Sequence, residues 1–146
     1  MVGFISDHPR AQALIRIGDE AIARENPEML RAFFAEDFVF HGPSGDRNFD
    51  QLSGYFASLR AALSDFRLVR EQILVEGDHL AARNTFSGVF TGVFTQSPIG
   101  VLQPTGRRVQ WEAINTFRYD ADERLAEEWV QTDYRSMLVS FGAVTA

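Results

Sequence analysis

The feature that most constrains the fold is a change of hydrophobic period near Ser64 and Asp65. Before this point apolar residues recur every three or four positions in three segments, the spacing of amphipathic helices. After it, four long runs are rich in β-branched and aromatic residues, at 66–76, 79–91, 107–119 and 125 to about 134. Helices first and long antiparallel strands later predict an α+β fold, with the helices packed on one face of a curved sheet.

The three helical segments are separated by clear breaks. We expect helices at about 9–25, at 27–34 after Asn26, and at 49–63, with one last helical turn near 137–141. A short strand at 37–41 should end at the turn-forming cluster 42–45. The turns at 77–78 and 120–122 predict two tight hairpins, whereas 92–106 is long and partly apolar and predicts a loop folded over an opening.

Composition limits the classes of function. Of 146 residues, 45% are hydrophobic and 13 are phenylalanine, so we expect one folded domain over 1–146 with an aromatic core. The net charge of -6 argues against a nucleic-acid partner. The chain has no cysteine and no signal or membrane-spanning segment, so we expect a cytoplasmic protein. The three histidines form no pair at metal-ligand spacing and no nucleotide motif occurs, so we expect neither metal nor cofactor.

One strand face already suggests an interior site. Alternation places Val109, Trp111, Ala113, Asn115 and Phe117 on the same mostly apolar face, which should point inward. A buried amide is costly without partners, so Asn115 either binds a ligand or satisfies another core group. Trp111 is either a platform for a flat ligand or an ordinary core residue.

Several short motifs, in order, carry a family resemblance. They are Phe38 to Pro43, EGDHLAAR at 76–83, Ser87-Gly88 with Thr91-Gly92, PTGRRV at 104–109, Phe117-Arg118, and AEEW at 126–129 followed by Asp133. From about Ala11 to Gly142 the chain resembles the SnoaL-like polyketide cyclases of the nuclear transport factor two-like superfamily. The resemblance implies a cone-shaped, curved antiparallel sheet packed with three N-terminal helices around a pocket for a small hydrophobic molecule, commonly in a homodimer.

The resemblance also implies functional positions, and this chain departs from them. Cyclases of the family close rings by aldol chemistry with an aspartate at the position of Val130, a histidine at that of Asn115 and, in a looser match, an asparagine at that of Tyr55. Valine cannot carry a proton, so that mechanism does not transfer intact. A ketosteroid isomerase of the same fold would have its base at Gly42, next to His41.

Other residues could carry the acid–base chemistry. Glu128 shares strand parity with Val130, so it should face the same pocket, where burial would raise its pKa; the alternative is an ion pair with Arg83 or Arg118. Asp133 is either a displaced acid or a helix cap. His41 either transfers protons or holds its loop.

Tyr55 could donate a hydrogen bond to a carbonyl or enolate oxygen, or it packs on the sheet as an ordinary aromatic residue. Three functions therefore stay open. The first is a cofactor-independent cyclase, isomerase or lyase acting on a small hydrophobic, carbonyl-bearing molecule. The second is a noncatalytic binding module for such a molecule, and the third is a structural dimerisation domain.

Overall fold

The computed structural model describes residues 3–146. The helical half and its strands are α1 (Pro9–Ile17), a π-helical continuation η1 (Gly18–Ile22), α2 (Pro27–Phe33), β1 (Phe34–Gly42), β2 (Gly45–Arg47) and α3 (Phe49–Ala62). The second half comprises β3 (Leu63–Glu76), β4 (His79–Phe90), β5 (Phe94–Ser97), β6 (Gly100–Leu102), β7 (Arg108–Tyr119), β8 (Leu125–Thr132) and α4 (Tyr134–Ser140). The change of period near residue 64 thus marks the start of β3.

Local sequence explains where the helices begin. The His8 ring accepts a hydrogen bond from the backbone of Arg10, and Pro9 occupies the first turn of α1. Asn26 caps α2 in the same way. Asn48 and Gln51 form a reciprocal capping box at α3.

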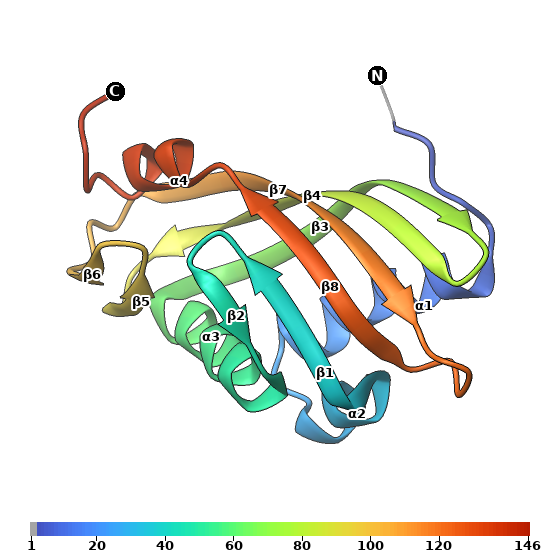
Figure 1. Ribbon diagram of the computed structural model, residues 1–146. Coiled ribbons are helices and arrows are strands. Elements are labelled where there is room, and N and C mark those ends of the chain that lie inside the picture. The colour runs from blue at the N-terminus through green and yellow to red at the C-terminus, as the bar shows by residue number, and fades with distance from the viewer. Residues whose placement is uncertain (1–2) are drawn as a thin grey trace.

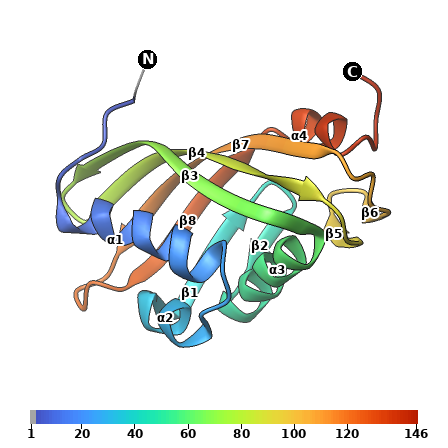
Figure 2. The ribbon, with the colours of Figure 1, turned by 180° about the vertical axis from the view of Figure 1, so that it is seen from behind.

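Six strands form the main sheet in the order β2-β1-β8-β7-β4-β3. All neighbouring pairs are antiparallel except β1 and β8, which run parallel, so the sheet departs at one pair from the antiparallel arrangement expected from the sequence. Figures 1 and 2 show α1, α2 and α3 under the concave side of this curved sheet, with α4 near the beginning of β7. The α+β fold expected from the sequence is confirmed.

The connection at 92–106 is more ordered than a plain loop. It forms the two-stranded β5–β6 hairpin, which lies against α3 (Figure 1). Phe94 is fully buried between the rings of Tyr55 and Phe141, at centroid distances of 6.4 and 5.4 Å. Ile99 and Val101 are exposed at its tip. The hairpin is therefore anchored to the core at its base.

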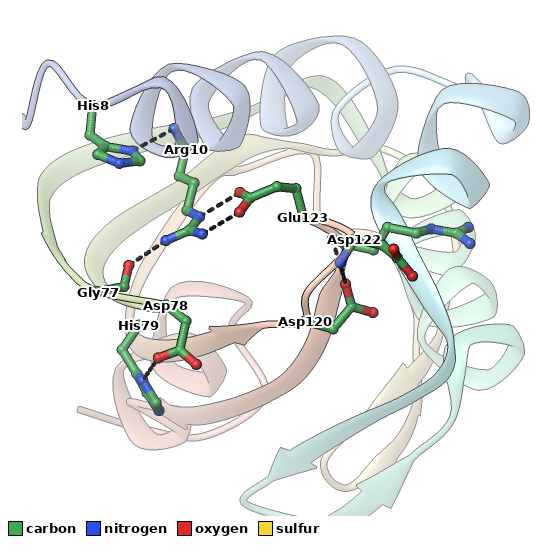
Figure 3. Close-up of polar contacts among 9 residues, drawn as sticks. His8, Arg10, Gly77, Asp78, His79, Asp120, Asp122 and Glu123 are labelled. Carbon is green, nitrogen blue, oxygen red and sulfur yellow. Dashed lines mark hydrogen bonds and ion pairs between the residues drawn. The ribbon is translucent and has the colours of Figure 1, made fainter.

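An arginine ties the opposite end of the fold together (Figure 3). Arg10 of α1 donates two hydrogen bonds to the carboxylate of Glu123, in the β7–β8 turn, and one to the carbonyl of Gly77, in the β3–β4 turn. Its guanidinium also lies 5.3 Å from the centre of the Tyr119 ring. A single side chain thus fastens the first helix to both hairpins.

Within residues 3–146, no helix is long and apolar enough to cross a membrane.

Candidate functional site

A cavity lies between the concave face of the sheet and helices α1, α2 and α3. Most of its lining is aliphatic and aromatic, and the polar contributors are Tyr55, Arg70, Asn115, Glu128 and Thr132. The volume of the cavity is about 60 Å³. The cavity is therefore narrow, suited to a flat or small apolar molecule rather than a bulky one.

Four polar side chains, one from each of four adjacent strands, form a row of hydrogen bonds at this cavity, and all but Asn84 line it. Arg70 of β3 donates to Asn84 of β4 at 2.8 Å, and the Asn84 amide donates to the side-chain oxygen of Asn115 in β7 at 2.6 Å. The Asn115 amide then donates to Oε2 of Glu128 in β8. We call Arg70, Asn84, Asn115 and Glu128 the polar ladder.

The polar ladder is enclosed by apolar groups. Asn84 is fully buried, and Asn115 and Glu128 are only 6% and 7% exposed. Among the hydrogen bonds of residues 3–146, none reaches Oε1 of Glu128, and the buried Nε of Arg70 also has no partner. The ladder therefore keeps one free carboxyl oxygen beside the cavity.

Burial sets the charge state of both ends of the ladder. Removal from water raises the pKa of Glu128 to about 7, against the opposing effects of the Asn115 hydrogen bond and the Arg70 charge. Burial also lowers the pKa of Arg70 to about 10, so its guanidinium stays charged at neutral pH. A carboxyl group with a pKa near neutrality can both accept and release a proton.

Tyr55 and Trp111 line the same cavity. Burial raises the pKa of the Tyr55 phenol, which keeps it protonated and able to donate. Trp111 is 3% exposed and stacks on Phe86, with ring centres 5.1 Å apart and planes within 5° of each other. Trp111 is thus part of the core as well as of the cavity wall, so the two interpretations of it are compatible.

Sequence comparison assigns the chain to a family. A family model described as SnoaL-like polyketide cyclase matches residues 12–139. The chain belongs to the SnoaL-like polyketide cyclase family. No curated protein sequence matches it significantly.

Solved structures with the same fold include members from several bacteria. IdmH of Streptomyces antibioticus, a candidate polyketide cyclase, is 26% identical with a TM-score of 0.74, over 92% of this chain and 99% of its own. AclR of Streptomyces galilaeus, a candidate hydroxylase, is 23% identical with a TM-score of 0.79, over 94% and 83%. A Catenulispora acidiphila protein with a ketosteroid isomerase-like fold, in complex with trimethylamine, is 18% identical with a TM-score of 0.70, over 95% and 96%. Because these descriptions differ, the fold leaves the reaction open.

The three positions that the SnoaL-like resemblance singles out meet at one cavity. Val130 lies opposite Asn115 in the β7–β8 register, and Tyr55 reaches the same space from α3. Glu128, two residues before Val130, faces the cavity as strand parity predicts. The arginines considered as its ion-pair partners bind elsewhere, since Arg83 pairs with Glu112 and Arg118 with Glu127.

The two other acid–base candidates of this SnoaL-like chain lie away from the cavity. Asp133 caps α4, where its carboxylate accepts hydrogen bonds from the backbone and the hydroxyl of Ser136. These bonds hold the pKa of Asp133 below its usual value. The structure therefore gives Asp133 the capping geometry that was the alternative to catalysis.

His41 lies on the outer side of the sheet. Its ring stacks on Trp129 at 5.4 Å and contacts the carboxylates of Glu127, at 2.7 Å, and Asp46, at 3.0 Å. These carboxylates, Glu127 first, raise the pKa of His41. His41 thus joins β8 to the β1–β2 hairpin, which corresponds to its loop-holding interpretation.

Sequence reasoning missed Arg70 and Asn84. Asn84 shares parity with Leu80 and Ala82 in β4, so alternation alone would have placed it inside. Arg70 follows Leu68 by two residues but stands at an irregularity in the β3–β4 register, and arginine is usually exposed. Across residues 3–146, no group of three or more His, Cys, Asp or Glu side chains is arranged to hold a metal ion.

Proposed function

We propose that this SnoaL-like protein binds a small hydrophobic, carbonyl-bearing molecule in its cavity and exchanges a proton with it through Glu128. The observation that carries the proposal is the burial of the Glu128 carboxyl group in an apolar cavity, with a pKa near 7 and one oxygen free. Near neutral pH such a group is present in both its protonated and its ionised form. The reaction is of the isomerase, lyase or cyclase type and needs no cofactor.

The proposed step is proton abstraction beside a carbonyl group. Oε1 of Glu128 takes the proton from the α-carbon, the C–H electron pair forms the enolate C=C bond, and the carbonyl π electrons move to oxygen. The Tyr55 phenol donates to the developing oxyanion. Protonation at a different carbon would isomerise the substrate, and attack of the enolate on a second carbonyl would close a ring.

Hydrogen–deuterium exchange at the α-carbon of a ketone tests this step without knowledge of the natural substrate. Proton NMR in D₂O would follow cyclohexanone, acetophenone and α-tetralone, a series of increasing size. We expect the protein to accelerate exchange of at least one of these ketones, with a rate that rises with pH up to about pH 7 and then levels off. Glu128→Gln should lower the protein-catalysed rate by about 100-fold or more.

Two variants with the same chemical change serve as controls. Glu127→Gln alters the neighbouring residue of β8, whose carboxylate contacts His41 and Arg118 rather than the cavity. Asp133→Asn keeps a side chain that can cap α4. Both should exchange the ketone at the wild-type rate. If Asp133→Asn abolished exchange while Glu128→Gln retained it, the assignment of the base to Glu128 would be wrong.

A second candidate function is noncatalytic binding, which Val130 favours because it occupies the family's aspartate position inside the cavity. In that case a ketone would bind, detected by calorimetry, but its α-protons would exchange at the rate of buffer alone.

We also propose a homodimer formed through the outer face of the sheet. Val69, Ile114 and Trp129 are exposed and lie on strand positions opposite in parity to the cavity-facing residues of their strands. Leu74 is also exposed, beyond the register shift that follows Arg70 in β3. Light scattering after size-exclusion chromatography tests this proposal, and the mass of a single chain would contradict it. A dimer without ketone binding would favour the third function, a structural dimerisation domain.

A further inference from the structure

Two members of the polar ladder have no part in the proposed proton transfer. Arg70 and Asn84 lie behind Asn115, on the side away from Glu128. Asn84 is fully buried and Arg70 is partly buried, so folding removes an amide and much of a charge from water. Their hydrogen-bond chemistry suggests a role.

The chain of hydrogen bonds can run in only one direction. A guanidinium group donates and cannot accept, so the side chain of Asn84 must turn its oxygen toward Arg70. The Asn84 nitrogen then faces Asn115, which must turn its own oxygen toward Asn84. The nitrogen of Asn115 is left facing Glu128. The Asn84 nitrogen also donates to the backbone carbonyl of Ala113 at 3.4 Å, which favours the same orientation. Arg70 and this carbonyl together fix the amide of Asn84, and Asn84 in turn fixes that of Asn115.

The orientation of the last amide matters for the carboxyl group. An N–H donated to a carboxylate favours the ionised form, whereas a carbonyl oxygen in the same place would favour the protonated form. If Asn115 were free to turn over, it would accept a proton from neutral Glu128 instead of stabilising its anion. The base would then be ionised only at higher pH.

We propose that Arg70 and Asn84 are positioning residues that fix the amide of Asn115 with its nitrogen toward Glu128. The catalytic consequence rests on the proposed function, but the orientation itself does not. The guanidinium group of Arg70 packs beside Gly18 of η1, where even an added Cβ would be in ordinary van der Waals contact, 3.5 Å from Nε and Nη2.

Other groups around Glu128 must be separated from this effect. The charged and titratable neighbours are Arg70 of β3, Tyr119 of β7 and Tyr55 of α3, and Asp19 of η1 acts on Arg70. Arg70 favours the anion of Glu128 by its charge alone, whatever the amides do. A decisive variant must therefore break the hydrogen-bond chain and keep the Arg70 charge.

Asn84→Leu meets that requirement. The pKa of Glu128 would be followed from the ¹³C shift of its carboxyl carbon as a function of pH. We expect the pKa to rise by about one unit relative to wild type, because Asn115 is no longer held in one orientation. The control is Thr85→Val, which changes the next residue of β4 and leaves the chain of hydrogen bonds intact. An unchanged Glu128 pKa in folded Asn84→Leu would overturn the proposal.

A neutron diffraction map of the wild-type protein decides the matter independently, including the case in which Asn84→Leu does not fold. Deuterium on the Asn115 side-chain nitrogen, directed at Glu128, is the expected result, and the Asn115 oxygen in that place would contradict the proposal. Neither readout requires turnover. A raised pKa in Asn84→Leu together with no ketone exchange by the wild type would sink the proposed function and leave the positioning role standing.

Discussion

Glu127 and Glu128 are neighbours in the sequence, yet their carboxyl groups have opposite pKa shifts. Hydrogen bonds from His41 and Arg118 lower the pKa of Glu127 on the outer side of the sheet. Burial raises the pKa of Glu128 on the inner side. Successive side chains of a strand point to opposite faces of the sheet. For this reason Glu127 forms salt bridges on the outer face, whereas Glu128 is a candidate base on the inner face.

The raised pKa of Glu128 has a measurable effect on stability. The folded chain binds this proton more tightly than the unfolded chain, so the contribution of Glu128 falls as pH rises from its unfolded pKa toward about 7. Between about pH 4.5 and about pH 8.5 the loss should be on the order of 3 kcal/mol. Urea unfolding of wild type and Glu128→Gln at both pH values measures it, because the substitution removes the titrating group.

The comparison of the two proteins cancels the other titrating groups. His41, whose pKa is also raised, loses its stabilising contribution over a higher pH range in both proteins alike. The difference in unfolding free energy between wild type and Glu128→Gln should thus shift in favour of the variant as pH rises. A difference that stays constant with pH would show that Glu128 has an ordinary pKa.

The sequence predicts the direction of a site residue well in the middle of a strand and poorly at its end. Trp111, Asn115, Glu128 and Val130 occupy regular strand positions, and alternation places all four on the cavity side. His41 and Asp133 stand next to the ends of β1 and β8, where the period of two no longer indicates a direction.

At the scale of elements, periodicity does not reveal two places where segments approach each other near a glycine. The first helical segment was predicted as one continuous helix, but it becomes π-helical at Gly18, next to the guanidinium group of Arg70. Single π-helical turns often occur at functional sites. The second approach is at Gly92, where the chain leaves β4 and its backbone N–H donates to the carbonyl of Ala62 at the end of α3.

A pair of glycine substitutions tests how the β5–β6 hairpin is attached. A Cβ at Gly92 would overlap the carbonyl oxygen of Ala61, so Gly92→Ala should destabilise the protein by about 1–3 kcal/mol. In Gly54→Ala the new Cβ has only Gln96 within reach, at 3.9 Å, and the helix should gain about 0.5–1 kcal/mol. Urea unfolding at one pH gives both values. Equal free energies of unfolding for the two variants would mean that the backbone near Gly92 moves away from α3 without destabilising the protein.

Pairing between distant strands was the least predictable level of the fold. The turns at 77–78 and 120–122 indicate antiparallel hairpins because they join adjacent strands. No local signal indicates that β1 pairs with β8, where His41 lies opposite Trp129, or that the pair is parallel.

At the scale of the whole molecule, the two faces of one curved sheet carry different kinds of side chain. The concave face holds the cavity and the polar ladder, and the convex face holds His41, the salt bridges and the exposed apolar residues. The family match and the similar solved structures agree on the architecture. Because the descriptions of those proteins differ, the reaction has to be inferred from the individual side chains of the cavity. In the proposed function, the chemistry depends on the few polar groups that line the cavity.

The most direct test of this account is a ¹³C NMR titration of the Glu128 carboxyl carbon in the wild-type protein, with and without α-tetralone. We expect a midpoint near pH 7 without ligand and a displaced signal when the ketone is present. A midpoint at the ordinary glutamate value, unaffected by the ketone, would contradict it.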